Sequence, residues 1–430
     1  MKDFVYHNPV EVRFGPGVLA GLGARVRAAG LDHVVLVGGG EAARRVGAYD
    51  QAVASLDAAG VRRGEVWGVT ANPDLGTVLR IAAAAGTGTE GSVGNSPIGG
   101  GTGFVAIGGG SVIDATKAAA ALVPLLAEGR DPWSPFAERQ PVTRSLPVFA
   151  VSILSGTGSE MNGNAVITRG ASGHKWGMRC PSPVATFVDV TFQQGLPWHL
   201  TVNGAADAMS HVLEFSVVGT PAASAKGSRR KDSEFPFFAE EAALAQNEAL
   251  LRTIVRAAAR LRADAHDIEA RGALAWASGV GLSGLTGVGL GAGSWESHAL
   301  EHAVSGLHPH VPHGLALAVI YPRWMEEVAP DKAPAMRRLA AALETTVAEA
   351  LAEPGEDGNP LSLPAGDKDA PERCALLLRT LFRHWGAPAG LSHWGVVEGD
   401  VPRLVQLAKE YPRPLQLAAE RVERVFRASL

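Results

Sequence analysis

The chain has 430 residues and a formal net charge of −4 at pH 7. Hydrophobic residues make up 46 % of it and charged residues 19 %, a balance that excludes disorder and predicts about two or three folded domains. The lack of a basic excess argues against nucleic-acid binding, and only Cys180 and Cys374 are present, which fits a reducing compartment. No signal peptide and no apolar run of about 18 residues is found, so we expect a cytoplasmic protein without a membrane partner.

Strand-like and helix-like segments alternate in the first half of the chain. Short β-branched or alternating runs predict strands at residues 10–14, 33–37, 64–69, 104–107 and 148–151. Helical patterns lie between them at residues 18–29, 75–85 and 112–126. Glycine-rich turns separate these segments, an order that is typical of a parallel sheet covered by helices.

The second half changes character at about residue 200, where the apolar pattern becomes helical. Amphipathic helices are expected at residues 239–262, 268–282 and 333–351. We therefore predict an α/β domain at residues 1–198 and an all-helical domain at residues 199–430. Two stretches rich in small or charged residues, 85–103 and 222–234, are expected to be mobile surface loops.

One glycine-rich turn is a candidate phosphate site. Gly108, Gly109, Gly110 and Ser111 follow a buried strand and open a helix, with Asp114 on the first turns of that helix. A pyrophosphate binds where backbone N–H groups at a helix N-terminus are not covered by side chains. The alternative is an ordinary strand-to-helix turn, but three glycines followed by a serine expected to cap the helix favour binding.

A second turn, at the end of the second strand, lies where the ribose of an adenosine would be expected. Gly38, Gly39 and Gly40 form this turn, and Glu41 follows. Glu41 would bind ribose hydroxyls and favour NAD, whereas the nearby arginines at positions 44 and 45 would meet a 2′-phosphate and favour NADP. The alternative is that all three are surface charges, and the sequence leaves the choice open.

Histidines and a carboxylate cluster in the helical half. Asp207 and His211 are four residues apart on one helix face, and His298 and His302 have the same spacing. His313 follows, and five of the 13 histidines fall between residues 298 and 313. One carboxylate with up to three imidazoles suits a divalent metal, either Fe²⁺ or Zn²⁺, without selecting between them.

Taken together, these motifs resemble the iron-containing (group III) alcohol dehydrogenases, and among them the butanol-dehydrogenase-like branch. The resemblance covers nearly the whole chain. It is carried by residues 4–17 (FVYHNPVEVRFGPG), 108–117 (GGGSVIDATK), 155–162 (SGTGSEMN), 205–214 (AADAMSHVLE), 270–284 (ARGALAWASGVGLSG) and 298–314 (HALEHAVSGLHPHVPHG).

The resemblance implies a fold, an activity and a set of site residues. The fold is an N-terminal α/β dinucleotide-binding domain and an all-α C-terminal domain, as in dehydroquinate-synthase-like proteins, with the site in the cleft between them. The activity is the interconversion of a primary alcohol and its aldehyde with NAD or NADP, in an assembly that is often a homodimer or larger. By resemblance, the metal ligands are Asp207, His211, His298 and His313. The resemblance also implies that His302 relays a proton. Further cofactor contacts are implied for Gly109, Gly110, Ser111, Asp114, Asn72, Thr157, Asn164 and Lys175.

Two departures from the family pattern bear on the cofactor. Relatives usually have serine where this chain has Glu41, and a glutamate would repel a 2′-phosphate. Ile153 and Leu154 stand where many members have two threonines. One alternative is a non-redox, metal-dependent lyase of the dehydroquinate-synthase-like type. A metal-dependent hydrolase is another, but it would leave the glycine turns without a role.

Overall fold

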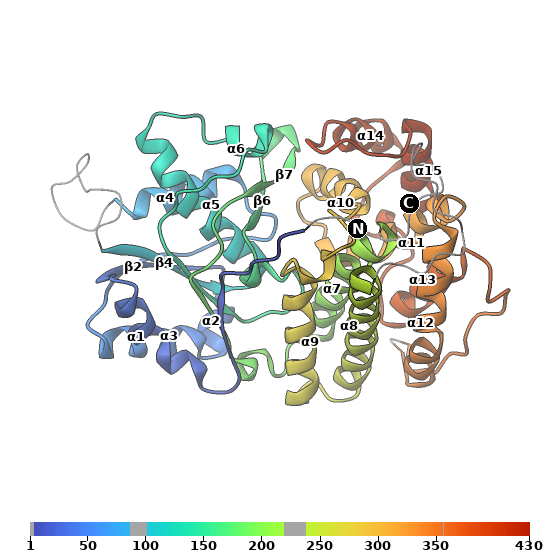
Figure 1. Cartoon of the computed structure of the whole chain (residues 1–430), viewed down its shortest axis with the longest axis horizontal. Helices are drawn as coiled ribbons and strands as arrows, with labels where there is room; N and C mark the ends of the chain where they lie inside the picture. The colour runs from blue at the N-terminus through green and yellow to red at the C-terminus, as the bar shows by residue number, and fades with distance from the viewer. Residues whose placement is uncertain (1–3, 87–100, 219–237, 356) are drawn as a thin grey trace.

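The computed structural model describes residues 4–86, 101–218, 238–355 and 357–430. Figure 1 shows two parts side by side, with the sheet and its helices in blue to green and the helical half in yellow-green to red. The predicted loop at 222–234 and most of the one at 85–103 lie outside the described residues.

Six parallel strands form one sheet in the order β1-β8-β5-β4-β2-β3. The central strands are buried throughout, as expected of β-branched runs in a sheet covered on both faces. The strands are β1 (Glu11–Phe14), β2 (His33–Gly38), β3 (Arg62–Val66), β4 (Thr102–Gly108), β5 (Val148–Ser152) and β8 (Ala185–Val188). The last strand, β8, was not predicted. β3 ends at Val66, three residues before the end of the predicted strand, because the backbone N–H groups of residues 68 and 69 bond to the carbonyls of Gly39 and Gly38 at the end of β2.

Helices cover both faces of this sheet. One face packs against α1 (Leu22–Ala28) and α3 (Ala48–Ala58), and the other against α4 (Leu75–Ala84) and α5 (Gly110–Ala127). Among the described residues α5 alone is long and apolar enough to cross a membrane, but most of it is buried inside the protein. Buried Lys117 in its middle donates to the carbonyl of Ser159 at 2.8 Å. This packing is that of a core helix.

An antiparallel hairpin that the sequence reading missed lies on the α5 side of the sheet. It consists of β6 (Asn164–Thr168) and β7 (Lys175–Arg179). Asp114 on α5 accepts a hydrogen bond from the backbone N–H of Val166 at 3.0 Å and so fixes the hairpin to that helix. The hairpin lies on the side of the sheet that faces the helical half (Figure 1).

The second half is helical. Its main helices are α7 (Trp198–Val218), α8 (Phe238–Ala263), α9 (Ile268–Gly281), α10 (Glu296–Leu307), α11 (His313–Val328), α12 (Ala333–Ala352), α13 (Arg373–His384), α14 (Val401–Lys409) and α15 (Ala419–Ser429). Three of them, α8, α9 and α12, match the predicted helices within one residue at each end. The change from sheet to helices near α7 agrees with the predicted order of domains, and the exact boundary at 198/199 stays a prediction.

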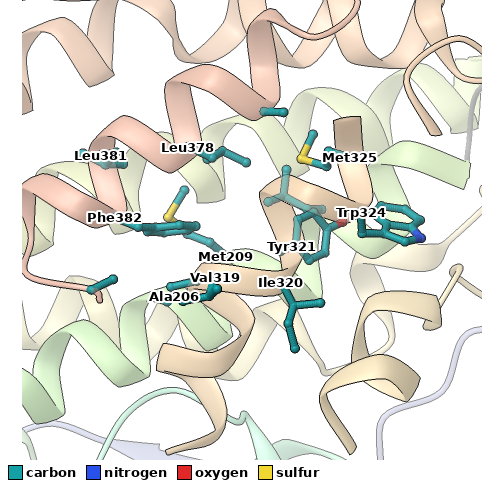
Figure 2. Packing of buried hydrophobic residues seen from close by; sticks show 14 of the residues in the cluster. Ala206, Met209, Val319, Ile320, Tyr321, Trp324, Met325, Leu378, Leu381 and Phe382 are labelled. Carbon is teal, nitrogen blue, oxygen red and sulfur yellow. The ribbon is translucent and has the colours of Figure 1, made fainter. Parts of the chain in front are cut away.

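One large apolar core fixes the helices of the second half. Met209 of α7, Tyr321 of α11 and Phe382 of α13 meet in it, each at most 2 % exposed, as Figure 2 shows. Burying side chains of this size stabilises the fold by roughly 1.5–3 kcal/mol each. Because α7 and α11 carry candidate metal ligands, this core also holds those ligands in place.

Candidate active site

A cavity of about 410 Å³ lies between the two halves of the chain. The turn before α5 and the β6–β7 hairpin line it from one half, and α7, α10 and the segment after α14 line it from the other. Its walls include the predicted residues Asn72, Gly110, Ser111, Asp114, Thr157, Asn164, Lys175, Asp207, His211, His298, His302 and His313. The sequence motifs of the two halves thus meet around one space.

Three of the four predicted metal ligands have their donor atoms within 4.8 Å of one another: Asp207, His298 and His313. The Oδ1 atom of Asp207 is 3.4 Å from Nε2 of His313 and 3.6 Å from Nε2 of His211. His211 also stacks on His298, with ring centroids 4.9 Å apart and nearly parallel planes. The fourth predicted ligand therefore adjoins the group without belonging to the closest three.

Charges inside this group are strongly perturbed. The imidazoles around Asp207 overcome its burial and hold the pKa of the carboxyl below its usual value, so that it is ionised. Burial lowers the pKa of His211 to about 3, and the ring is neutral. Burial also acts to lower the pKa of His313, but Glu301 and Asp207 outweigh it and raise the pKa to about 9. The protonated ring of His313 is thus a cation that lies between the carboxylates of Glu301 and Asp207.

Buried carboxylates orient two of the histidines. Oε1 of Glu214 lies 3.0 Å from Nδ1 of His298, and Oε2 of the same carboxylate accepts the backbone N–H of Trp295 at 2.7 Å. Glu301 accepts a hydrogen bond from Nδ1 of His313. Such bonds fix the tautomer and leave Nε2 of each ring for another partner. Neither glutamate was assigned a role from the sequence.

His302 lies beside the cluster of Asp207, His298 and His313 and is not part of it. Its ring is 5.6 Å from that of His313, 6.3 Å from that of His298 and 5.7 Å from that of Tyr411, between centroids. Burial lowers the pKa of His302 well below its ordinary value, so the ring is neutral. Its Nδ1 atom is buried and has no hydrogen-bond partner among the described residues.

Lys175 connects the hairpin to both neighbouring regions. Its Nζ atom donates to Oδ1 of Asn72 at 2.9 Å and to Oγ of Ser305 at 2.8 Å, and it lies 3.4 Å from Oε2 of Glu301. Asn72 in turn donates to the carbonyl of Pro309 at 2.9 Å. Lys175 is therefore bonded to α10, and Asn72 to the segment that leads into α11 and His313.

The turn before α5 has the open backbone that phosphate binding requires. Gly109 is the N-cap, in extended conformation and without a side-chain cap, and Ser111 lies inside the first turn of the helix. The expectation that Ser111 caps the helix is therefore wrong. A Cβ atom on Gly110 would collide with the side chain of Thr157, so only glycine fits there. Asp114 already accepts hydrogen bonds from Ser159 and Val166, and its predicted contact with ribose remains a prediction.

The other predicted cofactor residues lie outside the cavity wall. Gly108 ends β4, and a Cβ on it would overlap Val112. Gly38 ends β2 beneath the ring of Trp67, which a Cβ would strike, and Gly39 and Gly40 continue to the exposed side chain of Glu41. This group lies at the carboxyl end of β2, as the sequence predicted, and its contact with a cofactor stays a prediction.

Comparison with known proteins identifies the family. The model of the iron-containing alcohol dehydrogenases matches residues 9–190, and that of the C-terminal part of the same family matches residues 239–430. A probable NADH-dependent butanol dehydrogenase of Bacillus subtilis is 32 % identical over 79 % of this chain and 80 % of its own length. The chain belongs to the iron-containing alcohol dehydrogenase family.

Two further relatives show how far the likeness extends. The crystal structure of an NADH-dependent butanol dehydrogenase from Thermotoga maritima is 30 % identical and superposes with a TM-score of 0.82, covering 100 % of this chain and 99 % of that one. An NADPH-dependent aldehyde reductase of Escherichia coli is 27 % identical over 96 % of this chain and 94 % of its own length. As a member of this family the chain is a metal- and NAD(P)-dependent alcohol dehydrogenase or aldehyde reductase, and the lyase alternative is not favoured.

The residues present fit the metal that the family name implies. Asp207 Oδ1 is a buried acceptor without a hydrogen-bond partner among the described residues, although three imidazoles surround it. A buried, unsatisfied carboxylate oxygen is costly unless a cation binds it. One carboxylate and three imidazoles form a donor set suited to Fe²⁺ or Zn²⁺.

Several residues of the site were missed by reading the sequence. Glu214 and Glu301 each follow a histidine by three residues, so the same helix face presents both. This His-x-x-Glu spacing was a usable signal. Tyr411 and Arg413 come from the loop after α14 and line the cavity far from any motif. No local pattern in the sequence marks them.

Proposed function

We propose that this chain reduces a short aldehyde to its primary alcohol with NADH, and catalyses the reverse oxidation, using Asp207, His211, His298 and His313 to hold a divalent metal. The observation that carries the proposal is the unpartnered oxygen of Asp207, which lies among imidazoles in the same cavity as the open turn of α5. Metal donors and a phosphate-binding turn around one space are what such a dehydrogenase requires.

The bound groups supply the reactive chemistry: the metal acts as a Lewis acid on the substrate oxygen and the nicotinamide carries the hydride. The chain positions them. Backbone N–H groups at the start of α5 bind the pyrophosphate, and Gly110 leaves room for the side chain of Thr157, which lines the same cavity. Glu214 and Glu301 aim His298 and His313.

We assign His302 to proton transfer at the substrate hydroxyl. Its ring lines the cavity, and burial keeps it neutral, so it is able to accept the hydroxyl proton when an alcohol is oxidised. The ring packs against Tyr411, which limits its rotation. Because the other histidines of the cavity are committed to the metal, His302 is the one that remains for this task.

The preference for NADH is supported by the charges around the turn after β2. Glu41 is exposed there, and its carboxylate would repel a 2′-phosphate. Arg44 is stacked 3.8 Å from the ring centre of Tyr49 and 4.6 Å from that of Trp67, and its Nη2 atom lies 3.5 Å from Glu65. These contacts draw Arg44 toward Tyr49, Trp67 and Glu65 and so disfavour its contact with a 2′-phosphate. The Bacillus relative is likewise described as NADH-dependent.

The test is the initial rate of NADH and NADPH oxidation with small aldehydes, after anaerobic loading with either Fe²⁺ or Zn²⁺. We expect metal-dependent turnover that is faster with NADH. Absence of turnover with both metals and both cofactors, despite bound metal, would refute the proposal. A homodimer or larger assembly and a cytoplasmic location remain predictions, to be checked by light scattering and cell fractionation.

A further inference from the structure

We infer that the aldehyde this chain takes carries an anionic group at the end away from its carbonyl, and that Arg413 and Arg139 bind that group. The inference rests on the function proposed above, because it names the substrate class of the same cavity. Both arginines line the cavity wall together with the metal and cofactor residues.

Arg413 lies close to the metal cluster and is held in one orientation. Its Nη1 atom donates to the carbonyl of Ala292 at 3.1 Å and its Nη2 atom to that of Gly293 at 2.6 Å. The Ala292 carbonyl also accepts Nε1–H of Trp295 at 2.6 Å. The ring of Trp295 in turn lies 5.2 Å from that of His298. One shared carbonyl therefore separates the guanidinium from the tryptophan that packs on a metal ligand.

The charge of Arg413 is not neutralised by the protein. Carbonyl groups satisfy two of its five N–H donors but carry no charge. Within the described parts of the chain, no carboxylate lies at ion-pair distance from Arg413 or Arg139. The carboxylates of Glu214 and Glu296 act on the charge of Arg413 only from beyond ion-pair distance. Both have other partners: Glu214 lies against His298, and Glu296 accepts the backbone N–H groups of residues 416 and 417.

Arg139 adds a second positive charge to the same part of the cavity. It follows α6 (Ser134–Glu138) with φ of 56°, a left-handed conformation that is unfavourable for a non-glycine residue. Burial, and after it the charge of Arg139, lower the pKa of Arg413. Two guanidiniums that repel each other across a cavity are stabilised when an anion binds between them, and the planar guanidinium suits a carboxylate or a phosphate.

An uncharged substrate would leave both arginines unpaired, whereas an anionic one would pair with them while its carbonyl reaches the metal. The acidic residues of the cavity do not oppose this. Asp207 is committed to the metal cluster, and Asp114 accepts hydrogen bonds from Ser159 and Val166. The phosphates of the cofactor are the other anions in reach, but the turn before α5 provides for them.

The experiment compares three aldehydes of similar length with the metal-loaded enzyme and NADH: butanal, 4-oxobutanoate and 3-oxopropyl phosphate. We expect kcat/KM for at least one anionic aldehyde to exceed that for butanal by about tenfold or more, the effect of one charge-assisted hydrogen bond. The two anionic probes distinguish a carboxylate from a phosphate. Arg139→Met and Arg413→Met should each remove most of this advantage, measured as the ratio of kcat/KM for the anionic aldehyde to kcat/KM for butanal with the same variant. Arg144→Met, which removes a surface arginine outside this cavity, is the matched control.

A binding measurement gives a second readout that needs no turnover. Quenching of tryptophan fluorescence by 4-hydroxybutanoate, relative to 1-butanol, should weaken in both arginine variants and at high salt. If Arg413→Met does not fold, the exposed Arg139 still provides the test. Equal kcat/KM for butanal and both anionic aldehydes would overturn the inference and leave the proposed function standing. An arginine variant that changes the KM for NADH instead would also overturn it, by assigning these arginines to the cofactor.

Discussion

The carboxylate of Glu214 lies 3.0 Å from Nδ1 of His298, and both side chains are buried. This bond joins α7 to α10 and presents the opposite ring nitrogen to the metal cluster. We expect Glu214→Gln to lower metal affinity about 10- to 100-fold, because the bond that orients the ligand loses its charge. Metal content after dialysis against a graded chelator measures the loss. The control is Glu349→Gln, at an exposed carboxylate that pairs with Arg256 on the surface. Equal metal affinity in the wild type and both variants would contradict the role of Glu214.

Asp207→Ala and His302→Ala separate metal binding from proton transfer. Asp207→Ala should lose metal and activity together, because the anionic ligand is gone. His302→Ala should keep its metal and slow turnover by about 100- to 10,000-fold, the usual range for a lost acid–base group. Metal analysis beside steady-state rates checks both. An empty site in His302→Ala would show that the ligand assignment is wrong.

Glu41→Ser should shift the cofactor preference toward NADPH. The exposed carboxylate at the end of β2 is expected to repel the 2′-phosphate, and removing it should raise kcat/KM for NADPH by about tenfold relative to NADH. The ratio of the two values is the measurement. Glu128→Ser, on the surface after α5, is the matched loss of one negative charge, and it should leave the ratio unchanged.

Glu160 gives the fold a pH dependence. Burial raises the pKa of this carboxyl to about 7 from an ordinary 4.5. Between these two pKa values the unfolded chain therefore binds fewer protons at Glu160 than the folded protein does. The free energy of unfolding falls as pH rises through that window, and the full cost of burying the ionised carboxylate is present above about pH 7. Each pKa unit corresponds to about 1.4 kcal/mol, so the whole effect is about 3 kcal/mol.

Glu160→Gln resembles the protonated acid at every pH and should remove this cost. Urea unfolding at several pH values should show the advantage of the variant growing between pH 5 and pH 8. Glu269→Gln, at an exposed side chain, provides the control. An advantage that stays constant across this range would mean that Glu160 is ionised in the folded protein already at low pH.

Removal of the metal should destabilise the helical half. The cluster brings a carboxylate and three imidazoles from α7, α10 and α11 together, and a ligand that binds only the folded state stabilises it. A chelator should therefore lower the melting temperature of the wild-type protein, and added Zn²⁺ should restore it. Asp207→Ala should not respond to either treatment. A response in that variant would place the metal elsewhere.

Much of the architecture could be predicted because its determinants are local. The buried runs of β2 and β4 and the glycines that follow them predicted a parallel sheet, and the family and fold class are confirmed by the comparisons. The hairpin and β8 were missed, since their strands are only four or five residues long and β7 contains Gly177. What holds the hairpin is a long-range bond between Asp114 and Val166, 52 residues apart.

The candidate site was predictable where it rests on helix periodicity. Asp207 and His211, four residues apart, do lie on one face of α7. The pairing between helices was not visible, because Glu214 follows His211 in the sequence but bonds to His298 instead. Arg413 lies in an irregular segment whose position depends on the fold of the whole helical half. Such contacts are fixed by tertiary packing, and no local spacing encodes them.

Asn72 belongs to the nucleotide-binding half, yet it donates to the carbonyls of Pro309 and Val311 and accepts from Lys175. The last residues before His313 are therefore attached to the opposite side of the cavity. Any shift of Asn72 or Lys175 when the dinucleotide binds is passed to a candidate metal ligand. Binding free energies that are coupled in this way are reciprocal: if the cofactor tightens the hold on the metal, the metal tightens the hold on the cofactor by the same factor. The two sites would then behave as one thermodynamic unit, and a dissociation constant measured for either has meaning only when the occupancy of the other is stated.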